Sequence, residues 1–590
     1  MSASSSRRLR QLHAHLTSAA APTMRRNVRP GDEDMEQVET SYFLREAFRP
    51  RMDESTVQFD LGEAAVAGAK LVVDRTVTTT MVGTVPHDLV GCFLRIGPNP
   101  TFDFEGKPYH VFDGDGMVHA VSFPPVSDAD SNDGVQNSRV ATYANRWVRT
   151  RAREKDDAQG FSFSVMGEAS QIFETGSLAW VPYARDLGDA GRANTSLVWH
   201  APSRRLLALF EQDKPYALDP ATLETVGRVD AFQGRADAAD AAAPNATSIR
   251  DHDKLTFPTF TAHPKVCAVT GDMIYFGYIN GPRKGPWCHY GVIDGSTGKI
   301  ACAFPVTLPA PVMMHDIAIT TNYSLFYDYN LMYNHPRDLM SGKKKQMYEY
   351  DPTRASRFGV LPRRASSEKE IIWIETKTPC VLFHFATAFE HPTEGDGDII
   401  MVYGVAQVDI DLDNLGGESS RQSGGKMHVW RLNVRTGVCE VDAHVDETMS
   451  GTCDFAQVPM DRVGRPIRYC YAATFSGGFE VDGVVKFDLQ TGTHQILRYG
   501  PGVFGGESMF ARRAGWAPGD GSDEDDGYLL SFTYTKKGKG GAEGEEDWVS
   551  MLDIVNAKTM QRVSRVAMPR RVPMGFHALW MPRQQLALRV

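Results

Sequence analysis

The stretch HYGVIDGSTGKIACAF, residues 289–304, has the pattern of two short β-strands joined by a tight turn. Residues that favour strands flank an Asp-Gly and a Thr-Gly pair, and glycine supplies the positive φ that hairpin turns need. The same turn pattern recurs in RLNVRTGVCEV (431–441) and FDLQTGTHQI (487–496). We therefore expect antiparallel hairpins to be the unit from which this chain is built.

From about Ser41 onward, the chain reads as β runs of about four to eight residues separated by Gly, Pro, Asn and Asp. Helical periodicity is confined to the N-terminus and to residues 162–187. Many short hairpins in a long chain predict an all-β fold, either a β-propeller or a large sandwich. No regular repeat with a WD signature is present, so the pattern does not set a number of blades.

The composition bounds the class of protein. With 42% hydrophobic and 23% charged residues, the 590-residue chain can bury a large core. A net charge of −10 argues against a nucleic-acid partner, which needs a basic field. No apolar run reaches the roughly 18 residues that span a bilayer. The eight cysteines include no C-x-x-C pair, which argues against a thiolate zinc site and favours reduced thiols inside a cell.

The N-terminal segment has no acidic residue before Asp32, is rich in Ser, Ala and Arg, and lacks the apolar core of a secretory signal. An organelle transit peptide and a disordered basic tail fit this composition equally. We expect residues 1–44 to form a leader or transit-like segment and residues 45–590 a single domain. The expected location is cytoplasmic, or plastidic if residues 1–40 act as a transit peptide.

Four of the 17 histidines lie in apolar stretches bounded by small or turn residues. They are His263 in FTAHPK, His315 in PVMMHDIAIT, His384 in CVLFHFATAFE and His577 in VPMGFHALW. Apolar neighbours predict burial, and a buried imidazole needs partners for both ring nitrogens. Wide spacing along the chain suits a metal on a propeller axis, where each blade contributes one inner residue. Buried structural histidines are common, so the spacing alone leaves that alternative open.

These four segments, in this order, resemble the four histidine motifs of the carotenoid cleavage oxygenases. The resemblance extends from about residue 45 and includes GCFLRIGPNPTF (91–102), FDGDGMVHAVSF (112–123), RLLALFEQDKPYALDPATLET (205–225) and VGRPIRYCYA (463–472). Within the family, the chain is most similar to the plant-type enzymes that cleave carotenoids at the 9,10 and 9′,10′ double bonds. That likeness rests on FTAHPK, MMHDIAIT and DKPYALDPATLETVG.

The resemblance implies a seven-bladed β-propeller with a mostly helical cap over the iron-bearing face. It also implies that His263, His315, His384 and His577 bind one Fe(II) ion on the propeller axis. The implied reaction is cleavage of a carotenoid or apocarotenoid C=C bond by O₂ into two carbonyl products. No residue beyond the metal centre is expected to be catalytic, because no proton must leave the substrate. A long apolar tunnel would place the double bond, with Phe112, Trp147, Phe210 and Phe385 as candidate lining residues.

Three carboxylates are implied as partners that fix the tautomer and orientation of three ligand rings. They are Glu211 for His315, Asp454 for His384 and Glu507 for His577. The family usually has Glu at the position of Asp454, so we expect a hydrogen bond through water or a small backbone shift. His263 has no such carboxylate in the family.

A second departure lies in FHFATAFE (383–390) and in His391, the residue that directly follows it. The family commonly has Asn where Thr387 stands and an acid where His391 stands. His384 and Glu390 still match, so the ligand is retained while the local geometry stays open.

Two other functions are compatible with the sequence. A stilbene-cleaving oxygenase of the same family would use a Tyr and a Lys to polarise the phenol, and Trp147 in NRWVRT stands where that Tyr is expected. A non-catalytic propeller that serves as a binding scaffold would have lost a ligand, whereas all four histidines are present.

A peripheral membrane surface is a possible partner, since carotenoids reside in bilayers. The segment at 327–345, YDYNLMYNHPRDLMSGKKK, combines Leu331, Met332 and Tyr333, which we expect to be exposed, with three consecutive lysines. This combination predicts a monotopic docking patch, with an ordinary solvated loop as the alternative.

Overall fold

The computed structural model describes most of one compact unit, residues 46–590. The described residues are 53–61, 83–102, 112, 114–125, 139–160, 191–232, 255, 257–279, 285, 287–344, 346–408, 410, 425–477, 480–517, 523–536 and 548–586. The predicted leader at 1–44 and the predicted helix at 162–187 lie outside them.

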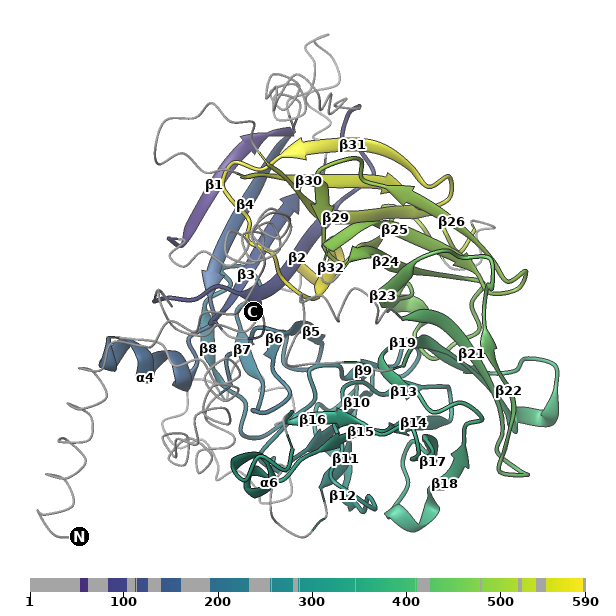
Figure 1. Cartoon of the computed structure of the whole chain (residues 1–590). Helices are drawn as coiled ribbons and strands as arrows, with labels where there is room; N and C mark the ends of the chain where they lie inside the picture. Colours follow the sequence, from purple (N-terminus) through teal and green to yellow (C-terminus); the bar gives the residue numbers. More distant parts are fainter. Residues whose placement is uncertain are drawn as a thin grey trace, which may run out of the picture. The chain divides into compact units, whose positions relative to one another are not determined.

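The described strands form antiparallel sheets from neighbouring parts of the chain, and Figure 1 shows these sheets following one another around a centre. The first sheet contains β1 (Ser55–Asp60), β2 (Gly91–Pro98), β3 (Gly116–Phe123), β4 (Val140–Trp147) and the last strand, β32 (Ala578–Pro582). The second contains β5 (Ser196–His200), β6 (Arg205–Leu209), β7 (Tyr216–Leu218) and β8 (Thr225–Arg228). The third contains β9 (Lys265–Val266), β10 (Met273–Tyr278), β11 (Cys288–Ile293) and β12 (Ile300–Val306).

The fourth and fifth sheets continue the series. The fourth contains β13 (Ala318–Ile319), β14 (Tyr323–Asp328), β17 (Arg357–Pro362) and β18 (Ile372–Glu375), with β15 (Leu331–Tyr333) and β16 (Tyr348–Tyr350) as a separate two-stranded ribbon. The fifth contains β19 (Val381–Glu390), β20 (Ile399–Gln407), β21 (Lys426–Asn433) and β22 (Val438–His444).

The remaining strands form one nine-stranded sheet that divides into two blades. The first group is β23 (Thr452–Gln457), β24 (Tyr469–Gly477), β25 (Glu480–Asp488) and β26 (Thr493–Arg498). The second group is β28 (Met509–Arg512), β29 (Gly527–Lys536), β30 (Trp548–Asn556) and β31 (Gln561–Ala567). Strand β27 (Val503–Gly505) connects them and pairs with β25 only at Val481↔Gly505. The chain therefore forms the predicted seven-bladed β-propeller.

The hairpin expected at 289–304 is strands β11 and β12, which pair from Cys288↔Val306 to Ile293↔Ile300. In its turn, Oδ1 of Asp294 accepts hydrogen bonds from the backbone N–H groups of Ser296 and Thr297. Gly298 takes the positive φ, at 69°. Local turn chemistry thus builds this unit as the sequence predicts.

The propeller closes where its last strand joins the first sheet. Strand β2 pairs with β32 from Gly91↔Pro582 to Arg95↔Ala578. Beyond this pairing, the N–H of Ile96 donates to the carbonyl of His577 at 3.1 Å. Closure joins strands from the two ends of the described unit, so neither β2 nor β32 is left as an open sheet edge at this joint.

Helices are few and short in the part of the chain that the structure describes. They are α4 (Arg151–Gln159), α6 (Pro336–Met340) and α7 (Arg583–Leu586), with 3₁₀ turns at Glu368–Glu370, Gly395–Gly397 and Met460–Arg462. Helix α4 begins at Thr150, whose side chain accepts a hydrogen bond from the N–H of Arg153. The mostly helical cap stays a prediction.

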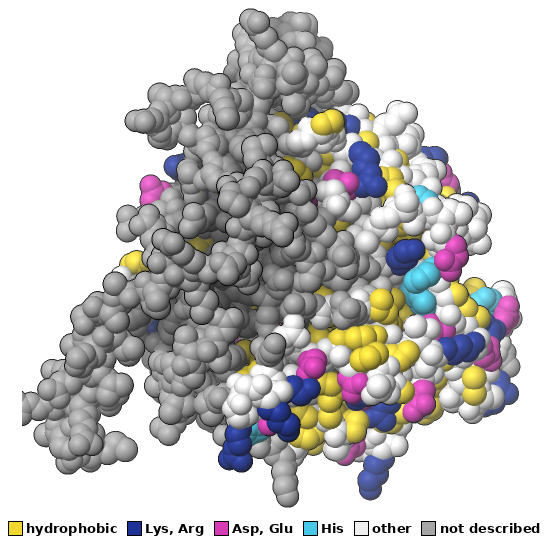
Figure 2. All heavy atoms as spheres, in the orientation of Figure 1, with side chains coloured by type: hydrophobic (Ala, Val, Ile, Leu, Met, Phe, Trp, Pro, Cys, Tyr) yellow, Lys and Arg dark blue, Asp and Glu magenta, His cyan; other side chains and the backbone are white. Residues whose placement is uncertain are grey.

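The predicted membrane-docking patch is wrong at Leu331. This side chain is fully buried and belongs to the core between neighbouring blades, because β15 pairs with β16 and turns it inward. Met332 and Tyr333 are half-buried and pack against the same core. None of the described helices is long and apolar enough to cross a bilayer. On the face shown in Figure 2, acidic and basic side chains are interspersed over the described surface.

Candidate metal centre

Four histidines meet at the centre of the propeller. One ring nitrogen from each of His263, His315, His384 and His577 lies within 4.8 Å of the others. Nε2 of His315 and Nε2 of His384 are 3.2 Å apart. His263, His384 and His577 are buried, with at most 9% of each residue exposed, and His315 is nearly so. The structure thus brings together the four histidines that the sequence singled out.

Each histidine comes from a different blade. His263 and His315 shortly precede β9 and β13, His384 lies inside β19, and His577 immediately precedes β32. Figure 1 shows these four strands near the centre of the ring. A propeller places the innermost strand of every blade along one axis, so residues far apart in sequence converge there.

Three of the rings are held by carboxylates. Nδ1 of His315 lies 2.6 Å from Oε1 of Glu211, and Nδ1 of His384 lies 2.7 Å from Oδ1 of Asp454. Nδ1 of His577 lies 3.2 Å from Oε1 of Glu507. An ionised carboxylate only accepts, so each Nδ1 carries the proton and each Nε2 presents its lone pair.

His263 has no carboxylate partner in the part of the chain that the structure describes. Its Nε2 is buried and has no hydrogen-bond partner among the described residues. Its backbone N–H donates to Oγ1 of Thr261 at 2.9 Å, which fixes the turn that carries the ring. A buried nitrogen left unpaired costs about 1–3 kcal/mol, and a metal ion would satisfy it. The residues present therefore fit a metal ion, and neutral imidazoles are ligands that suit iron, copper, nickel and zinc.

Electrostatics at the centre favour the neutral form of two rings, His263 and His577. Burial, followed by the neighbouring His315 and His577, holds the pKa of His263 well below its usual value. Burial also lowers the pKa of His577, although Glu507 opposes it. At His384 burial lowers the pKa, but the Asp454 carboxylate outweighs it and the net shift is upward. A bound dication would take the place of that proton.

Asp454 reaches His384 directly, so the expected bridging water is not needed. Strand β23 carries a register irregularity between Asp454 and Gln457, and Phe455 adopts a left-handed φ of 54°. The N–H of Phe455 also donates to Oδ1 of Asp454, at 2.7 Å. Asp454 therefore contacts the ring directly from an irregular stretch of β23.

Three further groups hold the carboxylates and were missed in the sequence. The hydroxyl of Tyr278 donates to Oε2 of Glu211 at 2.6 Å, and Nε2 of Gln407 donates to Oδ2 of Asp454 at 3.0 Å. The backbone N–H of Ala578 donates to Oε2 of Glu507. Tyr278 and Gln407 read as ordinary strand residues, so no local signal could have found them. Each carboxylate therefore has both oxygens engaged.

A cavity of about 440 Å³ runs from the histidines along the inner strands. His263, His384, His577 and small residues such as Ala388 and Ala456 line it. Of the four aromatic residues proposed for a tunnel, only Phe385 lies on this cavity.

Thr387 and His391 depart from the family pattern in different surroundings. Thr387 lines the cavity, with its buried hydroxyl unpaired among the described residues. His391 lies beyond the end of β19, where its N–H donates to the carbonyl of Ile399.

The comparisons with known proteins agree with this geometry. Residues 69–582 match the family model described as "RPE65: Retinal pigment epithelial membrane protein". A carotenoid 9,10(9′,10′)-cleavage dioxygenase 1 of Arabidopsis thaliana is 34% identical over 85% of this chain and 86% of its own length. The chain belongs to the carotenoid cleavage oxygenase family, which includes RPE65.

Further proteins are similar to this chain in sequence or in structure. A carotenoid 9,10(9′,10′)-cleavage dioxygenase of Crocus sativus is 33% identical over 85% of this chain and 86% of its own length. The solved structure of cobalt-substituted Synechocystis ACO, an apocarotenoid oxygenase, has a TM-score of 0.67 at 21% identity and covers 92% of this chain and 98% of that one. A Pseudomonas brassicacearum lignostilbene dioxygenase has a TM-score of 0.66 at 21% identity and covers 91% of this chain and 97% of that one. These structures confirm the propeller fold.

Proposed function

We propose that this protein is a non-haem Fe(II) dioxygenase that cleaves a polyene double bond of a carotenoid or apocarotenoid at the 9,10 and/or 9′,10′ positions. The observation that carries the proposal is a cluster of four histidines, whose ring nitrogens converge on one point. Among the described residues, no Asp or Glu belongs to this cluster. The substrate class is supported by the 9,10(9′,10′)-cleaving relatives, which are 33–34% identical over 85% of the chain or more.

The metal would be held by Nε2 of His263, His315, His384 and His577. Glu211, Asp454 and Glu507 keep three of these rings in the tautomer with a bare Nε2. When bound, Fe(II) supplies the electron density that O₂ needs to react with a C=C bond, which amino-acid side chains do not provide.

The reaction balances without a general base. One C=C bond and one O₂ molecule give two C=O groups, so both oxygen atoms enter the products and no proton leaves the substrate. The protein's own contribution is placement, because holding a double bond beside the site removes much of the entropic barrier.

The stilbene alternative is disfavoured by Trp147 itself, which stands where the resemblance places a Tyr. Its Nε1–H donates to the carbonyl of Asn99 at 3.1 Å, and the guanidinium of Arg153 stacks 4.3 Å from its ring centroid. This position therefore carries no hydroxyl to polarise a phenol.

Reconstitution and product analysis test the function. The protein is loaded with Fe(II) without oxygen and then given β-carotene, an apocarotenal and resveratrol under O₂, with products identified by mass spectrometry. We expect cleavage of a carotenoid or apocarotenoid and none of resveratrol. Stoichiometric iron without cleavage would favour the binding scaffold, and cleavage of resveratrol alone would favour the stilbene oxygenase.

Two variants separate the site from the fold. His315→Ala should abolish both iron binding and turnover. His494→Ala, in a His–Asp pair with Asp446 at 2.6 Å elsewhere in the propeller, should retain both. Activity retained by His315→Ala would contradict the site assignment.

Location and membrane contact stay predictions. A cytoplasmic protein is expected, with a plastid as the alternative if residues 1–40 act as a transit peptide. Contact with a bilayer surface would give access to carotenoids, but it would need apolar groups other than Leu331.

A further inference from the structure

The carboxylate of Asp316 joins three of the segments that carry the histidines. It directly follows His315, and its side chain is 1% exposed. Oδ1 lies 2.7 Å from Nζ of Lys265, which is two residues after His263. Oδ2 accepts a hydrogen bond of 2.9 Å from the backbone N–H of Phe385, the residue after His384. One buried side chain therefore links the three segments that carry His263, His315 and His384, and each segment belongs to a different blade.

The contact to Phe385 lies at the end of an interruption in sheet pairing. Strand β19 pairs with β20 at Leu382↔Ala406 and resumes at Phe385↔Gly404, with a register shift between them. His384 thus lies where the β-ladder is interrupted. The hydrogen bond from Phe385 to Asp316 ties this irregular stretch to the next blade.

The buried carboxylate of Asp316 is held firmly by its partners. A carboxylate with almost no exposure must be paired and hydrogen-bonded, because leaving it unpaired costs several kcal/mol. Asp316 meets this demand with the ammonium of Lys265 and with two backbone N–H groups, from Phe385 and from Ile317 at 2.7 Å. Charge-assisted bonds of this kind are short and strong.

We propose that Asp316, paired with Lys265, is a positioning residue that sets the spacing of His263, His315 and His384 for metal binding. Its role differs from that of Glu211, Asp454 and Glu507. Those carboxylates bond to imidazole nitrogens and fix rings, whereas Asp316 bonds to the chain beside the rings and fixes their separation. The inference rests on the proposed metal centre.

The experiment titrates the full chain, stripped of metal, with Co(II). The visible absorption of bound Co(II) reports both the affinity of the protein for the ion and the geometry of the ligands. Asp316→Asn should weaken Co(II) binding about 10- to 100-fold, as loss of partners outside the ligand set generally does, and should change the visible spectrum. Lys265→Met keeps the bond from Phe385 but removes the counter-ion of the carboxylate, so it should also weaken Co(II) binding and change the spectrum, and unchanged affinity and spectrum would overturn the inference. It serves as the readout if Asp316→Asn does not fold.

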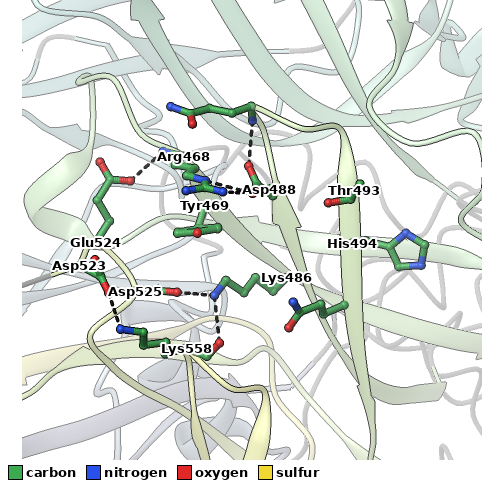
Figure 3. Close-up of a pocket in the computed structure, with 12 residues that line it drawn as sticks. Arg468, Tyr469, Lys486, Asp488, Thr493, His494, Asp523, Glu524, Asp525 and Lys558 are labelled. Carbon is green, nitrogen blue, oxygen red and sulfur yellow. Dashed lines mark hydrogen bonds and ion pairs between the residues drawn. The ribbon is translucent and has the colours of Figure 1, made fainter.

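A matched control separates positioning from stability. Lys486 and Asp525 form another buried Lys–Asp pair, and the side chain of each is 5% exposed. Figure 3 shows both among the residues that line a different pocket. Asp525→Asn should lower the thermal midpoint as Asp316→Asn does, while Co(II) affinity and spectrum stay unchanged. Equal weakening by both variants would overturn the inference.

The outcomes distinguish this inference from the proposed function. Wild-type binding together with unaltered affinity and spectrum in Asp316→Asn would overturn the positioning role and leave the metal centre standing. Failure of the wild type to bind Co(II) or Fe(II) would overturn the metal centre and this inference with it.

Discussion

Asp454 shows at the scale of single residues how a short side chain serves where a longer one is usual. It lies 2.7 Å from Nδ1 of His384, and Gln407 holds its other oxygen. The strand is irregular at this point, and Phe455 takes a left-handed φ of 54°. The orientation of His384 thus depends on a direct contact with an aspartate and on the groups that hold that aspartate.

We expect Asp454→Asn to weaken metal binding about 10- to 100-fold, because an amide cannot hold the ring as a charged acceptor does. Equilibrium titration with Co(II) measures this. Asp446→Asn, in the pair with His494, is the control and should bind as the wild type does. Unchanged affinity in Asp454→Asn would show that its contact with His384 does not support the site.

A second prediction at this scale concerns His200, at the end of β5. The residue is 3% exposed, its Nδ1 lies 2.6 Å from Oγ of Ser203, and burial lowers its pKa to about 4. An unfolded chain, with a histidine pKa of about 6.5, binds this proton where the folded protein does not. The contribution of neutral His200 to the free energy of unfolding is therefore complete above pH 6.5 and is lost as the pH falls towards 4.

The measurement compares wild type with His200→Leu, both free of metal, by urea unfolding at pH 7.5 and pH 5.0. The wild type should lose about 2 kcal/mol more free energy of unfolding than the variant between these values. Equal losses in the two proteins would contradict the prediction.

At the scale of elements, the closure of β2 on the end of the chain decides where His577 lies. The backbone of β2 approaches the segment before β32 so closely that a Cβ on Gly97 would lie 2.3 Å from Cα of Gly575. That segment leads directly into His577. Strand pairing and metal site are thus coupled through one tight contact.

Gly97→Ala should destabilise the protein by about 1–3 kcal/mol, since backbone atoms must move to admit the methyl group, and it should also weaken Co(II) binding. Thermal unfolding and metal titration test the two effects. Gly437→Ala, in a hairpin turn with φ of 68° and open space around it, is the control. It should lower stability through backbone strain alone, so weakened Co(II) binding in the control would contradict the proposed coupling.

At the scale of the whole molecule, the four candidate ligands come from four blades, one of which holds the closing strand. An ion bound there would cross-link blades that are otherwise joined through packing and short connections. Ligand binding to the folded state alone stabilises it by about 2.7 kcal/mol at a free concentration 100-fold above Kd.

Adding Co(II) or Fe(II) should therefore raise the thermal midpoint of the metal-free protein, and a chelator should reverse the rise. His263→Ala should show no such rise, because it removes a proposed ligand. Differential scanning calorimetry with and without metal measures both. An equal rise in wild type and variant would place the stabilising ion elsewhere.

The sequence was sufficient for the features that depend on local chemistry or on ordered motifs. Turn residues such as Asp294 and Gly298 predict hairpins because the turn conformation depends on the residues in it. The motifs around His263, His315, His384 and His577 predicted the family, and with it the seven blades that hairpin patterns alone could not count. The prediction that Leu331 is exposed was wrong, because pairing between β15 and β16 is not visible in a single segment.

Only the tertiary structure decided how distant groups meet. Contacts from Tyr278 to Glu211, from Gln407 to Asp454 and from Asp316 to Lys265 and Phe385 join residues whose own segments carry no sign of them. Each contact exists because blades converge on one axis and bury charged groups that must then find partners. The sequence by itself determined which residues could form a metal centre, and the convergence of the blades determined what holds them in place.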